Sequence, residues 1–381
     1  MKILFVCNNA YTKGNGLTTS IQNTIKHLRE RNLDVRLMAI ANPDPEGPQP
    51  DFPLKHFKFP LFEPIIRANG FSYAQIDRRV IRKAVEWADI VHFQEALLLE
   101  SVVRRIAVKQ GKTCTGTFHL YPHNITSNLA LGRENWVNPL LMKYWNWTVF
   151  NHCSDIQCPT RPVKDYLEKN HTKARLHVIS NGIQLPEPPL QVKPVNPEPE
   201  VKILCIGRLA KEKSQKTLLE AMRYSRHAGR IRLIFAGKGQ LEKRYRKQAE
   251  KLYREGILGI MPEFGFYSPE ELRNLARECY LYIHCAYVEV EGLSCLESMR
   301  EGLVPVIGQG ELIGTSQFAL CPESLYPVSD SRALAQRIDW WIEHPLQRNQ
   351  MSQRYADQAR RYAIDQSIDA LTAMFQNALQ R

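Results

Sequence analysis

A proline-rich segment lies close to the middle of this 381-residue chain, at residues 185–200. Its sequence is LPEPPLQVKPVNPEPE, so six of the chain's 23 prolines fall within 16 positions. Proline fixes the backbone φ angle and removes an amide donor, which excludes a helix interior or a central strand. The segment therefore predicts an extended linker between two domains, a number that also suits the length of the chain.

The same order of apolar strands and amphipathic helices occurs on both sides of this linker. Before it, the apolar run 2–7 leads through a polar loop to a helix at about 17–28 and a second strand at 34–40. After it, strands are expected at 202–207 and 231–236, again with a helix between them. Such alternation is typical of parallel sheets, which bind ligands at the carboxyl ends of their strands.

This pattern predicts an α/β protein with two facing, doubly wound Rossmann-like domains and a cleft between them. Residues 1–184 form the first domain and residues 201–359 the second. A C-terminal helix at about 360–381 is expected to pack back on the first domain.

Composition and charge exclude several classes of protein. Hydrophobic residues make up 44% and charged residues 24%, as in ordinary globular proteins, and no apolar run is long enough for a transmembrane helix. The N-terminus lacks a signal peptide, so the nine cysteines are expected to be reduced thiols in a cytoplasmic protein. The net charge is +12, with 24 basic and 16 acidic residues in 1–190. This surplus suits a nucleic acid, an anionic membrane or a phosphorylated substrate, or is a merely basic surface.

The stretch 286–307 carries the strongest chemical signal. Glu289 and Glu297 stand eight positions apart, with Gly292 in a turn and a helix expected to begin near Ser294. A helix N-terminus offers unpaired N–H groups and partial positive charge, which suit a diphosphate. Glu297 can accept hydrogen bonds from ribose hydroxyls, and Glu289 from those of a second sugar. A loop and an amphipathic helix with solvated carboxylates is the competing interpretation.

This stretch resembles the E-x7-E signature of family 4 retaining glycosyltransferases, which have the GT-B fold. The segment GRLAKEK at 207–213 resembles that family's G-R-L-x-x-E-K element. The resemblance implies that Arg208 and Lys213 reach the mouth of the cleft and neutralise a pyrophosphate. Glu291 stands where the family often has an aromatic residue, and the spacing favours Glu289 as the sugar contact.

Glycine-containing segments resemble the family's other donor contacts. Two of them, 237–239 and 265–267, correspond to backbone contacts around the nucleotide base. A third, Gly14-Asn15-Gly16, corresponds to a glycine loop near the donor phosphate. The resemblance therefore implies a donor-binding set of Gly16, Gly237, Gly239, Gly265, Phe266, Gly292, Leu293, Ser294 and Glu297.

Two histidines in the first half resemble further elements of the family. Thr117-Phe118-His119 resembles its T-x-H, whose histidine faces the donor sugar. His92, in the segment DIVHF, resembles an element near the acceptor, where Asn15 is also placed. For a lone histidine such as His92, a structural role is the alternative.

The resemblance implies retaining transfer of a hexosyl group from a nucleotide sugar, with uridine diphosphate favoured. Neither a cofactor nor a metal ion is expected. His119, Glu289, Arg208 and Lys213 are the expected catalytic residues. The alternatives are a GT-B nucleotide-sugar epimerase, a non-catalytic sugar-nucleotide-binding protein and a nucleic-acid-binding protein, for which we find no recognition motif. The sugar, the linkage and the oligomeric state stay open.

The acceptor is inferred from basic and aromatic residues in the first half. Cations at 78–83 and 104–112, and the apolar residues within 53–71 and 138–150, suit an anionic membrane surface. They predict a glycolipid, diacylglycerol or lipid-linked polysaccharide acceptor at the inner face of the cell membrane. Core aromatics with solvated cations, and hence a soluble sugar acceptor, is the alternative.

Overall fold

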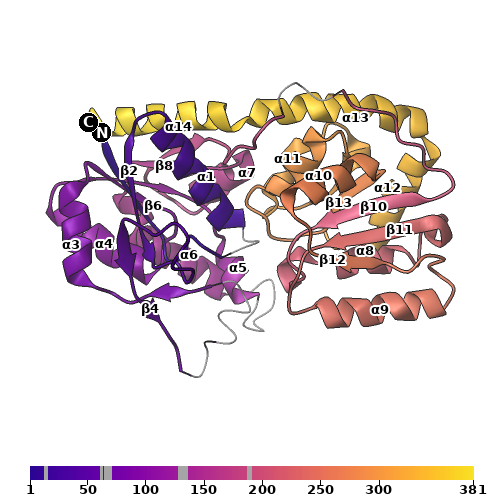
Figure 1. Cartoon of the computed structure of the whole chain (residues 1–381), viewed down its shortest axis with the longest axis horizontal. Helices are drawn as coiled ribbons and strands as arrows, with labels where there is room; N and C mark the ends of the chain where they lie inside the picture. Colours follow the sequence, from indigo (N-terminus) through magenta and orange to yellow (C-terminus); the bar gives the residue numbers. More distant parts are fainter. Residues whose placement is uncertain (13–15, 61–62, 64–70, 128–135, 187–190) are drawn as a thin grey trace. The chain divides into compact units, whose positions relative to one another are not determined.

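The computed structural model describes residues 1–12, 16–60, 63, 71–127, 136–186 and 191–381. The chain divides into two compact units (Figure 1). Unit 1 comprises Met1–Gly182 and Asp365–Arg381, and unit 2 comprises Ile183–Ile364. The end of the chain thus belongs to the same unit as its beginning. Residues 187–190 of the predicted linker lie outside the described residues.

Unit 1 is built on a seven-stranded sheet in the order β3-β2-β1-β6-β7-β8-β9. All of its neighbouring strands are parallel, so their carboxyl ends meet at one edge. A short antiparallel pair, β4 with β5, stands apart from this sheet. The strands are β1 (Lys2–Val6), β2 (Asp34–Ile40), β3 (Phe52–Leu54), β4 (His56–Phe57), β5 (Tyr73–Ala74), β6 (Ile90–Phe93), β7 (Thr113–Thr117), β8 (Asp155–Cys158) and β9 (Arg175–Val178).

Helices connect the strands of unit 1, and polar side chains fix where some of them begin. The Asp77 side chain accepts hydrogen bonds from the backbone N–H groups of Arg79 and Val80, so α3 begins at Arg78. The final helix is attached through Arg31, which pairs with Asp365 and Asp369. The helices are α1 (Gly16–Glu30), α3 (Arg78–Trp87), α4 (Leu98–Lys109), α5 (Pro122–Thr126), α6 (Val137–Thr148), α7 (Arg161–Lys169) and α14 (Ile364–Leu379).

Unit 2 repeats this plan with a six-stranded parallel sheet in the order β12-β11-β10-β13-β14-β15. Its strands are β10 (Val201–Ile206), β11 (Ile231–Ala236), β12 (Glu263–Gly265), β13 (Leu281–His284), β14 (Val304–Gln309) and β15 (Leu325–Pro327). Its helices are α8 (Lys216–Ala221), α9 (Glu242–Arg254), α10 (Pro269–Glu278), α11 (Leu293–Arg300), α12 (Ser331–Glu343) and α13 (Pro345–Ala359).

Because both sheets are parallel, their longer strands can be recognised in the sequence. A parallel sheet is covered on both faces, so a strand such as β13 is buried along its whole length. The predicted strands at 34–40 and 231–236 coincide with β2 and β11. Five strands, β3, β4, β5, β12 and β15, were not expected, because each has only two or three residues. No helix in the described part of the chain is long and apolar enough to cross a membrane.

Candidate functional site

The carboxyl edge of the sheet in unit 2 gathers the predicted donor residues. Arg208 follows β10, Gly237 follows β11, and Gly265 ends β12. The loop between β13 and α11 carries Glu289 beside these strand ends. This loop is fixed as a short parallel bridge, since Glu289 N–H donates to Leu312 O at 2.8 Å and its carbonyl accepts from Gly314 N–H at 2.7 Å.

Lys213 and Glu289 form a direct ion pair, although 76 positions separate them. Their side chains are 22% and 16% exposed, so solvent screens this pair little. Burial alone would raise the pKa of Glu289, but Lys213, His284 and Arg208 together outweigh burial and hold it below its usual value. The carboxylate is therefore ionised at neutral pH, and the two predicted residues form one charged unit.

Arg208 is oriented by a buried carboxylate that the sequence analysis did not single out. Its guanidinium donates to Glu212 Oε1 at 3.0 Å, and Glu212 is only 2% exposed. The carbonyl of Arg208 accepts from Gln215 Nε2 at 2.8 Å, which fixes the backbone as well. About a third of the Arg208 side chain remains exposed, so an anion can reach it.

Close backbone approach requires three of the predicted donor glycines. A Cβ atom on Gly237 would lie 2.1 Å from Gly207 O, and one on Gly239 would lie 2.4 Å from Leu209 O. Gly292 has φ of +81°, a left-handed conformation that glycine adopts without strain. These glycines let the loops pack tightly, whereas at Gly16, the first residue of α1, a Cβ atom would meet nothing within 4 Å.

The helix predicted near Ser294 begins one residue earlier, at Leu293. The Ser294 hydroxyl lies 3.0 Å from Tyr282 Oη, with which it shares a hydrogen bond. Its backbone N–H remains one of the groups at the helix N-terminus. Glu297 is exposed on the same helix, and the exposed Phe266 ring has the Lys238 ammonium 5.2 Å from its centre.

The carboxyl edge of unit 1 has a different character. His119 follows β7, and its Nε2 atom lies 3.0 Å from Gln94 Oε1, just beyond β6. Burial lowers the pKa of His119 to about 3, so the ring is neutral at physiological pH. In the adjacent loop after β1, the Asn8 amide donates to Glu95 and Glu100 at 3.0 and 3.2 Å. Both carboxylates are buried.

The structure shows the surroundings of His92, which was predicted to lie on the acceptor side. Its ring is completely buried within the sheet, where Nδ1 and Nε2 lie 2.9 and 3.0 Å from the hydroxyls of Thr115 and Thr117. The rings of Phe5 and Phe375 pack edge-on against it. His92 is therefore a satisfied core histidine, and burial lowers its pKa to about 3. Asn15, also placed near the acceptor, lies outside the described residues.

Several polar residues at these edges were missed by the sequence analysis. In unit 2, His284 lies beside Glu289 and Thr315 beside His284, and Asn8, Gln94 and Glu95 lie at the edge of unit 1. These residues share a position in the fold that could have revealed them: each polar side chain follows, ends or faces a buried strand. Within the described residues, no group of three or more His, Cys, Asp or Glu side chains is placed to hold a metal ion.

Comparison with known proteins gives two adjoining family matches. Residues 14–186 match the family described as Glycosyltransferase Family 4, and residues 188–360 match Glycosyl transferases group 1. Among curated proteins there is no match.

Solved structures resemble the chain along its whole length. The Anabaena protein HepE, solved with UDP and glucose, is 15% identical with a TM-score of 0.72, covering 99% of this chain and 100% of its own. Sucrose-phosphate synthase from Thermosynechococcus elongatus is 17% identical with a TM-score of 0.75, covering 99% and 98%. The catalytic domain of cholesterol-α-glucosyltransferase from Helicobacter pylori is 39% identical over 43% of this chain and 99% of its own, with a TM-score of 0.40.

Proposed function

Because this chain belongs to the group 1 glycosyltransferases, with a family 4 N-terminal domain and the GT-B fold, we propose that it transfers a hexosyl group from a UDP-linked sugar with retention at the anomeric carbon. One observation carries the donor assignment: the Lys213–Glu289 pair and Arg208 lie at the carboxyl edge of one sheet, beside the start of α11. The UDP-glucose bound to the Anabaena protein supports the choice of nucleotide.

The residues of unit 2 suit the charge that develops on a leaving diphosphate. In the proposed reaction the bond between the anomeric carbon and the diphosphate breaks as the acceptor oxygen bonds to the same face of that carbon. The acceptor proton passes to a diphosphate oxygen. Arg208, Lys213 and the N–H groups at the start of α11 stabilise the diphosphate charge. In this proposal Glu289 holds the sugar hydroxyls, and no metal ion takes part.

Donor binding tests this assignment without knowledge of the acceptor. Calorimetry with UDP should show weaker binding for Arg208→Ala and for Lys213→Ala, because each change removes a cation from the diphosphate site. Unchanged affinity in both variants would remove the diphosphate role. Turnover should also survive a chelator, and complete loss that one divalent ion restores would overturn the metal-free reaction.

We further propose that the acceptor is presented at an anionic membrane surface. A stripe of exposed apolar side chains runs along α6 and the residue before it, with Trp136 and Trp147 76% and 67% exposed. Leu140 and Tyr144 lie between them at helical spacing. Aromatic rings on the surface of a helix suit the headgroup region of a bilayer.

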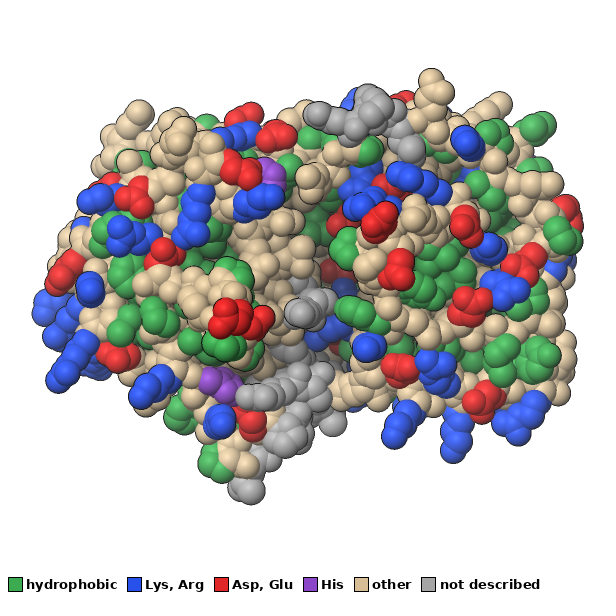
Figure 2. Space-filling model, viewed as in Figure 1, with side chains coloured by type: hydrophobic (Ala, Val, Ile, Leu, Met, Phe, Trp, Pro, Cys, Tyr) green, Lys and Arg blue, Asp and Glu red, His purple; other side chains and the backbone are tan. Residues whose placement is uncertain are grey.

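Cations on α3 supply the positive charge that the membrane proposal requires. Arg78, Arg79, Arg82 and Lys83 are all exposed, and Figure 2 shows basic side chains gathered over α3 at the edge of unit 1. Two other predicted cations have structural roles instead. Arg104 donates to Thr148 O at 2.7 Å, and Lys112 donates to the carbonyls at the end of α3.

The predicted apolar set also needs correction. Trp145 is buried in the core of unit 1. Phe52 and Leu54 are buried in β3, which overlaps the segment predicted to be interfacial. Phe62, Ile65 and Ile66 of that segment lie outside the described residues.

Vesicle sedimentation tests the membrane proposal. The protein should bind vesicles with anionic lipid and not zwitterionic ones, and about 0.5 M salt should release it, because the Debye length shrinks to a few ångströms. Replacing the four α3 cations with Gln should weaken binding by up to ~4 kcal/mol, at about 1 kcal/mol for each cation. Replacing Trp136 and Trp147 with Ser should weaken the binding that persists in salt.

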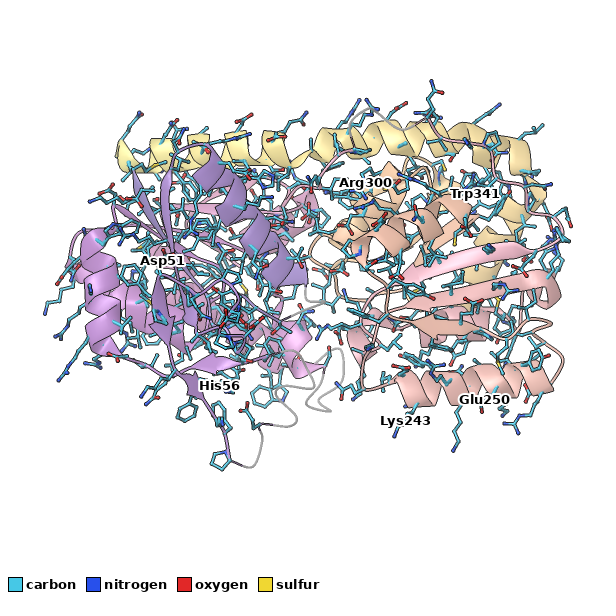
Figure 3. The ribbon with its side chains drawn as sticks, in the orientation of Figure 1. Asp51, His56, Lys243, Glu250, Arg300 and Trp341 are labelled. Atoms are coloured by element: carbon cyan, nitrogen blue, oxygen red, sulfur yellow. The ribbon has the colours of Figure 1, made fainter. Side chains whose placement is uncertain are left out.

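Four exposed cations of unit 2 provide a control that removes the same amount of charge. Lys243, Arg244, Lys247 and Lys251 are exposed on α9, and Figure 3 shows Lys243 projecting from that helix. Their replacement with Gln should leave vesicle binding unchanged. Equal effects of the two fourfold changes would make the charge surplus a solubility feature, and a soluble sugar acceptor would then be the better proposal. A donor screen by mass spectrometry with membrane lipid extract as acceptor would identify a lipid-linked product.

A further inference from the structure

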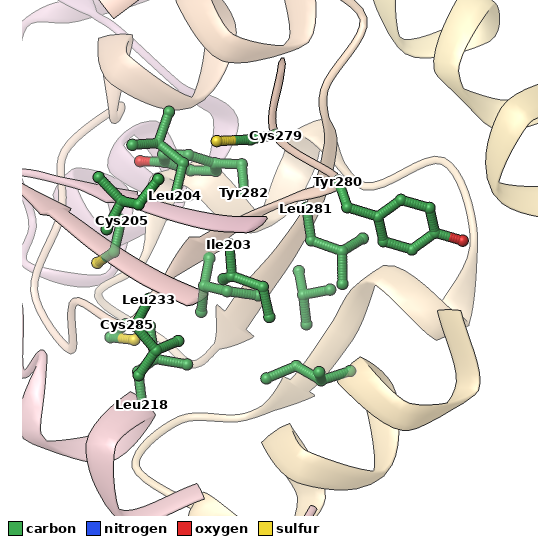
Figure 4. Close-up of a cluster of buried hydrophobic side chains, with 14 of the residues drawn as sticks. Ile203, Leu204, Cys205, Leu218, Leu233, Cys279, Tyr280, Leu281, Tyr282 and Cys285 are labelled. Carbon is green, nitrogen blue, oxygen red and sulfur yellow. The ribbon is translucent and has the colours of Figure 1, made fainter. Parts of the chain in front are cut away.

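His284 ends β13 at the carboxyl edge of unit 2 and is only 4% exposed. Its ring touches polar groups on both sides. Nε2 lies 3.3 Å from Thr315 Oγ1 and 3.5 Å from Glu289 Oε2, and Nδ1 lies 3.2 Å from Tyr282 Oη. The Tyr282 hydroxyl in turn lies 3.0 Å from Ser294 Oγ at the start of α11. Tyr282 is itself part of the buried cluster shown in Figure 4.

These contacts fix the position of each proton. The Thr315 hydroxyl donates its single proton to the carbonyl oxygen of Glu291 at 2.9 Å, so its oxygen can only accept from His284. The carboxylate of Glu289 is likewise an acceptor. Nε2 of His284 therefore carries the proton, and burial, which lowers the pKa of this ring to about 4, keeps the ring neutral.

The other ring nitrogen is then an acceptor. With Nδ1 unprotonated, Tyr282 donates its proton to His284 and its oxygen accepts the proton of Ser294. The chain of hydrogen bonds has one direction, from Ser294 through Tyr282 to the ring, and leaves the ring through Nε2–H. In this arrangement of hydrogen bonds, no two donors face each other.

We infer that His284 is a positioning residue for Glu289, whose carboxylate it directs through Nε2–H toward the sugar of the donor. This role rests on the proposed function, in which Glu289 contacts that sugar. Lys213 holds the same carboxylate oxygen, Oε2, so the ammonium and the imidazole approach one atom from two elements. The second oxygen, Oε1, is thereby the one left to accept from a ligand.

Two substitutions of His284 test the roles of its two ring nitrogens separately. Gln at position 284 can place an amide N–H near the position of Nε2, whereas Asn can only reach the position of Nδ1. His284→Gln should therefore keep the kcat for UDP release from UDP-glucose within about threefold of the parent, and His284→Asn should lose at least tenfold. UDP affinity by calorimetry should change in neither variant, because the diphosphate contacts are intact.

His227→Gln serves as the matched control, since His227 pairs with the partly exposed Glu343 at a distant place in the same unit. It should behave like the parent. Similar kcat values for His284→Asn, His284→Gln and the parent, with Glu289→Ala inactive, would overturn the role of His284 and leave the donor site intact. If Glu289→Ala also retains turnover, the proposed function fails instead.

The proton assignment is tested in the free protein, without a donor. Long-range ¹H–¹⁵N spectra of histidine-labelled protein at pH 7 should show the Nε2–H tautomer for His284, identified by its absence in His284→Gln. Glu289→Ala should shift the Nε2 resonance, and Glu250→Ala on α9 should not. An Nδ1–H tautomer or an imidazolium at pH 7 would overturn the inference, whatever the activity of the variants.

Discussion

The two sheets end in loops of similar layout but place different charges at their carboxyl edges. In unit 2 the carboxylates are matched by cations, as Lys213 pairs with Glu289 and Arg208 with Glu212. In unit 1 the Asn8 amide binds both Glu95 and Glu100, and within the described residues neither carboxylate has an ion-pair partner. Glu100, moreover, is completely buried.

This difference assigns chemistry to each edge. Cations beside a helix N-terminus suit a phosphorylated ligand, whereas an edge with buried carboxyl groups of raised pKa and a neutral histidine provides little charge to hold an anion and suits uncharged hydroxyl groups. Under the proposed function, two similar parallel sheets would thus serve as a donor site and an acceptor site according to their loop residues. Each prediction below alters one edge and leaves the other as a reference.

The largest effect is expected from the charged pair of unit 2. Glu289→Ala and Lys213→Ala should each lower turnover about a hundredfold, since a lost charged contact in the transition state costs ~3 kcal/mol. Each should also lower the melting temperature, because a partly buried charge is left alone. The double variant should recover much of the melting temperature but none of the turnover.

Exposed Lys243→Ala is the control for this pair, since it removes a charge from the same unit away from the edge. Near-parental turnover in both single variants would show that the donor site lies elsewhere. Recovery of turnover in the double variant would mean that the pair acts on stability alone.

Substitution of the glycines at the two edges should also change the stability by different amounts. Gly237→Ala and Gly239→Ala place a Cβ atom within 2.1 and 2.4 Å of backbone oxygens and should destabilise the protein by about 1–3 kcal/mol, as overpacking does. Gly16→Ala meets no atom within 4 Å and should leave the free energy of unfolding unchanged or slightly higher. Urea unfolding measures both. Equal destabilisation at Gly16 and Gly237 would contradict the difference in packing.

A smaller effect is expected from the histidine of unit 1. Gln94→Glu replaces a neutral partner of His119 with a carboxylate, which favours the charged ring and raises its pKa from about 3. Turnover should then fall on the acid side at a higher pH than in the parent, while UDP affinity stays the same. An unchanged pH profile, with the pKa of His119 shown by NMR to have risen, would remove His119 from the reaction.

The sequence was most informative where a physical pattern is local. Long parallel strands are nearly continuous apolar runs, so β11 was predicted residue by residue. The Glu289 and Lys213 motifs were found because their spacing within each loop is short. Their pairing, across 76 positions, depends on β10 lying next to β13, which no local pattern contains.

The surroundings of some residues could not be predicted for the same reason. His92 and His119 both follow apolar residues near a strand end, and only the paired strand β7 decides that His92 is covered by Thr115 and Thr117. His284 looked like the end of a core strand, and its partners come from two other loops. Local sequence predicts which element a residue occupies, and the neighbouring strands decide what its side chain meets.

The smallest expected effect concerns the buried carboxyl groups of unit 1. Burial and the nearby charge of Glu95 raise the pKa of Glu100 well above its usual value, so the folded protein favours its protonated form. Stability from this group is complete below the pKa of the unfolded chain, about 4.5, and is lost as the pH rises toward the folded value. Glu100→Gln mimics the protonated acid and cannot ionise. The variant should therefore lose less stability than the parent between pH 5 and 8.

Urea unfolding at several pH values measures this difference, with exposed Glu86→Gln in the same unit as the control. At pH 5 the two proteins should be nearly equal in stability, and the gap should widen in favour of Glu100→Gln as the pH rises. UDP affinity should not change, since the proposed UDP site belongs to the other unit. A parent whose stability rises from pH 5 to 8 relative to the variant would mean that Glu100 is ionised in the folded state. The edge of unit 1 would then carry negative charge, and a cationic group rather than a plain hydroxyl would be the ligand it suits.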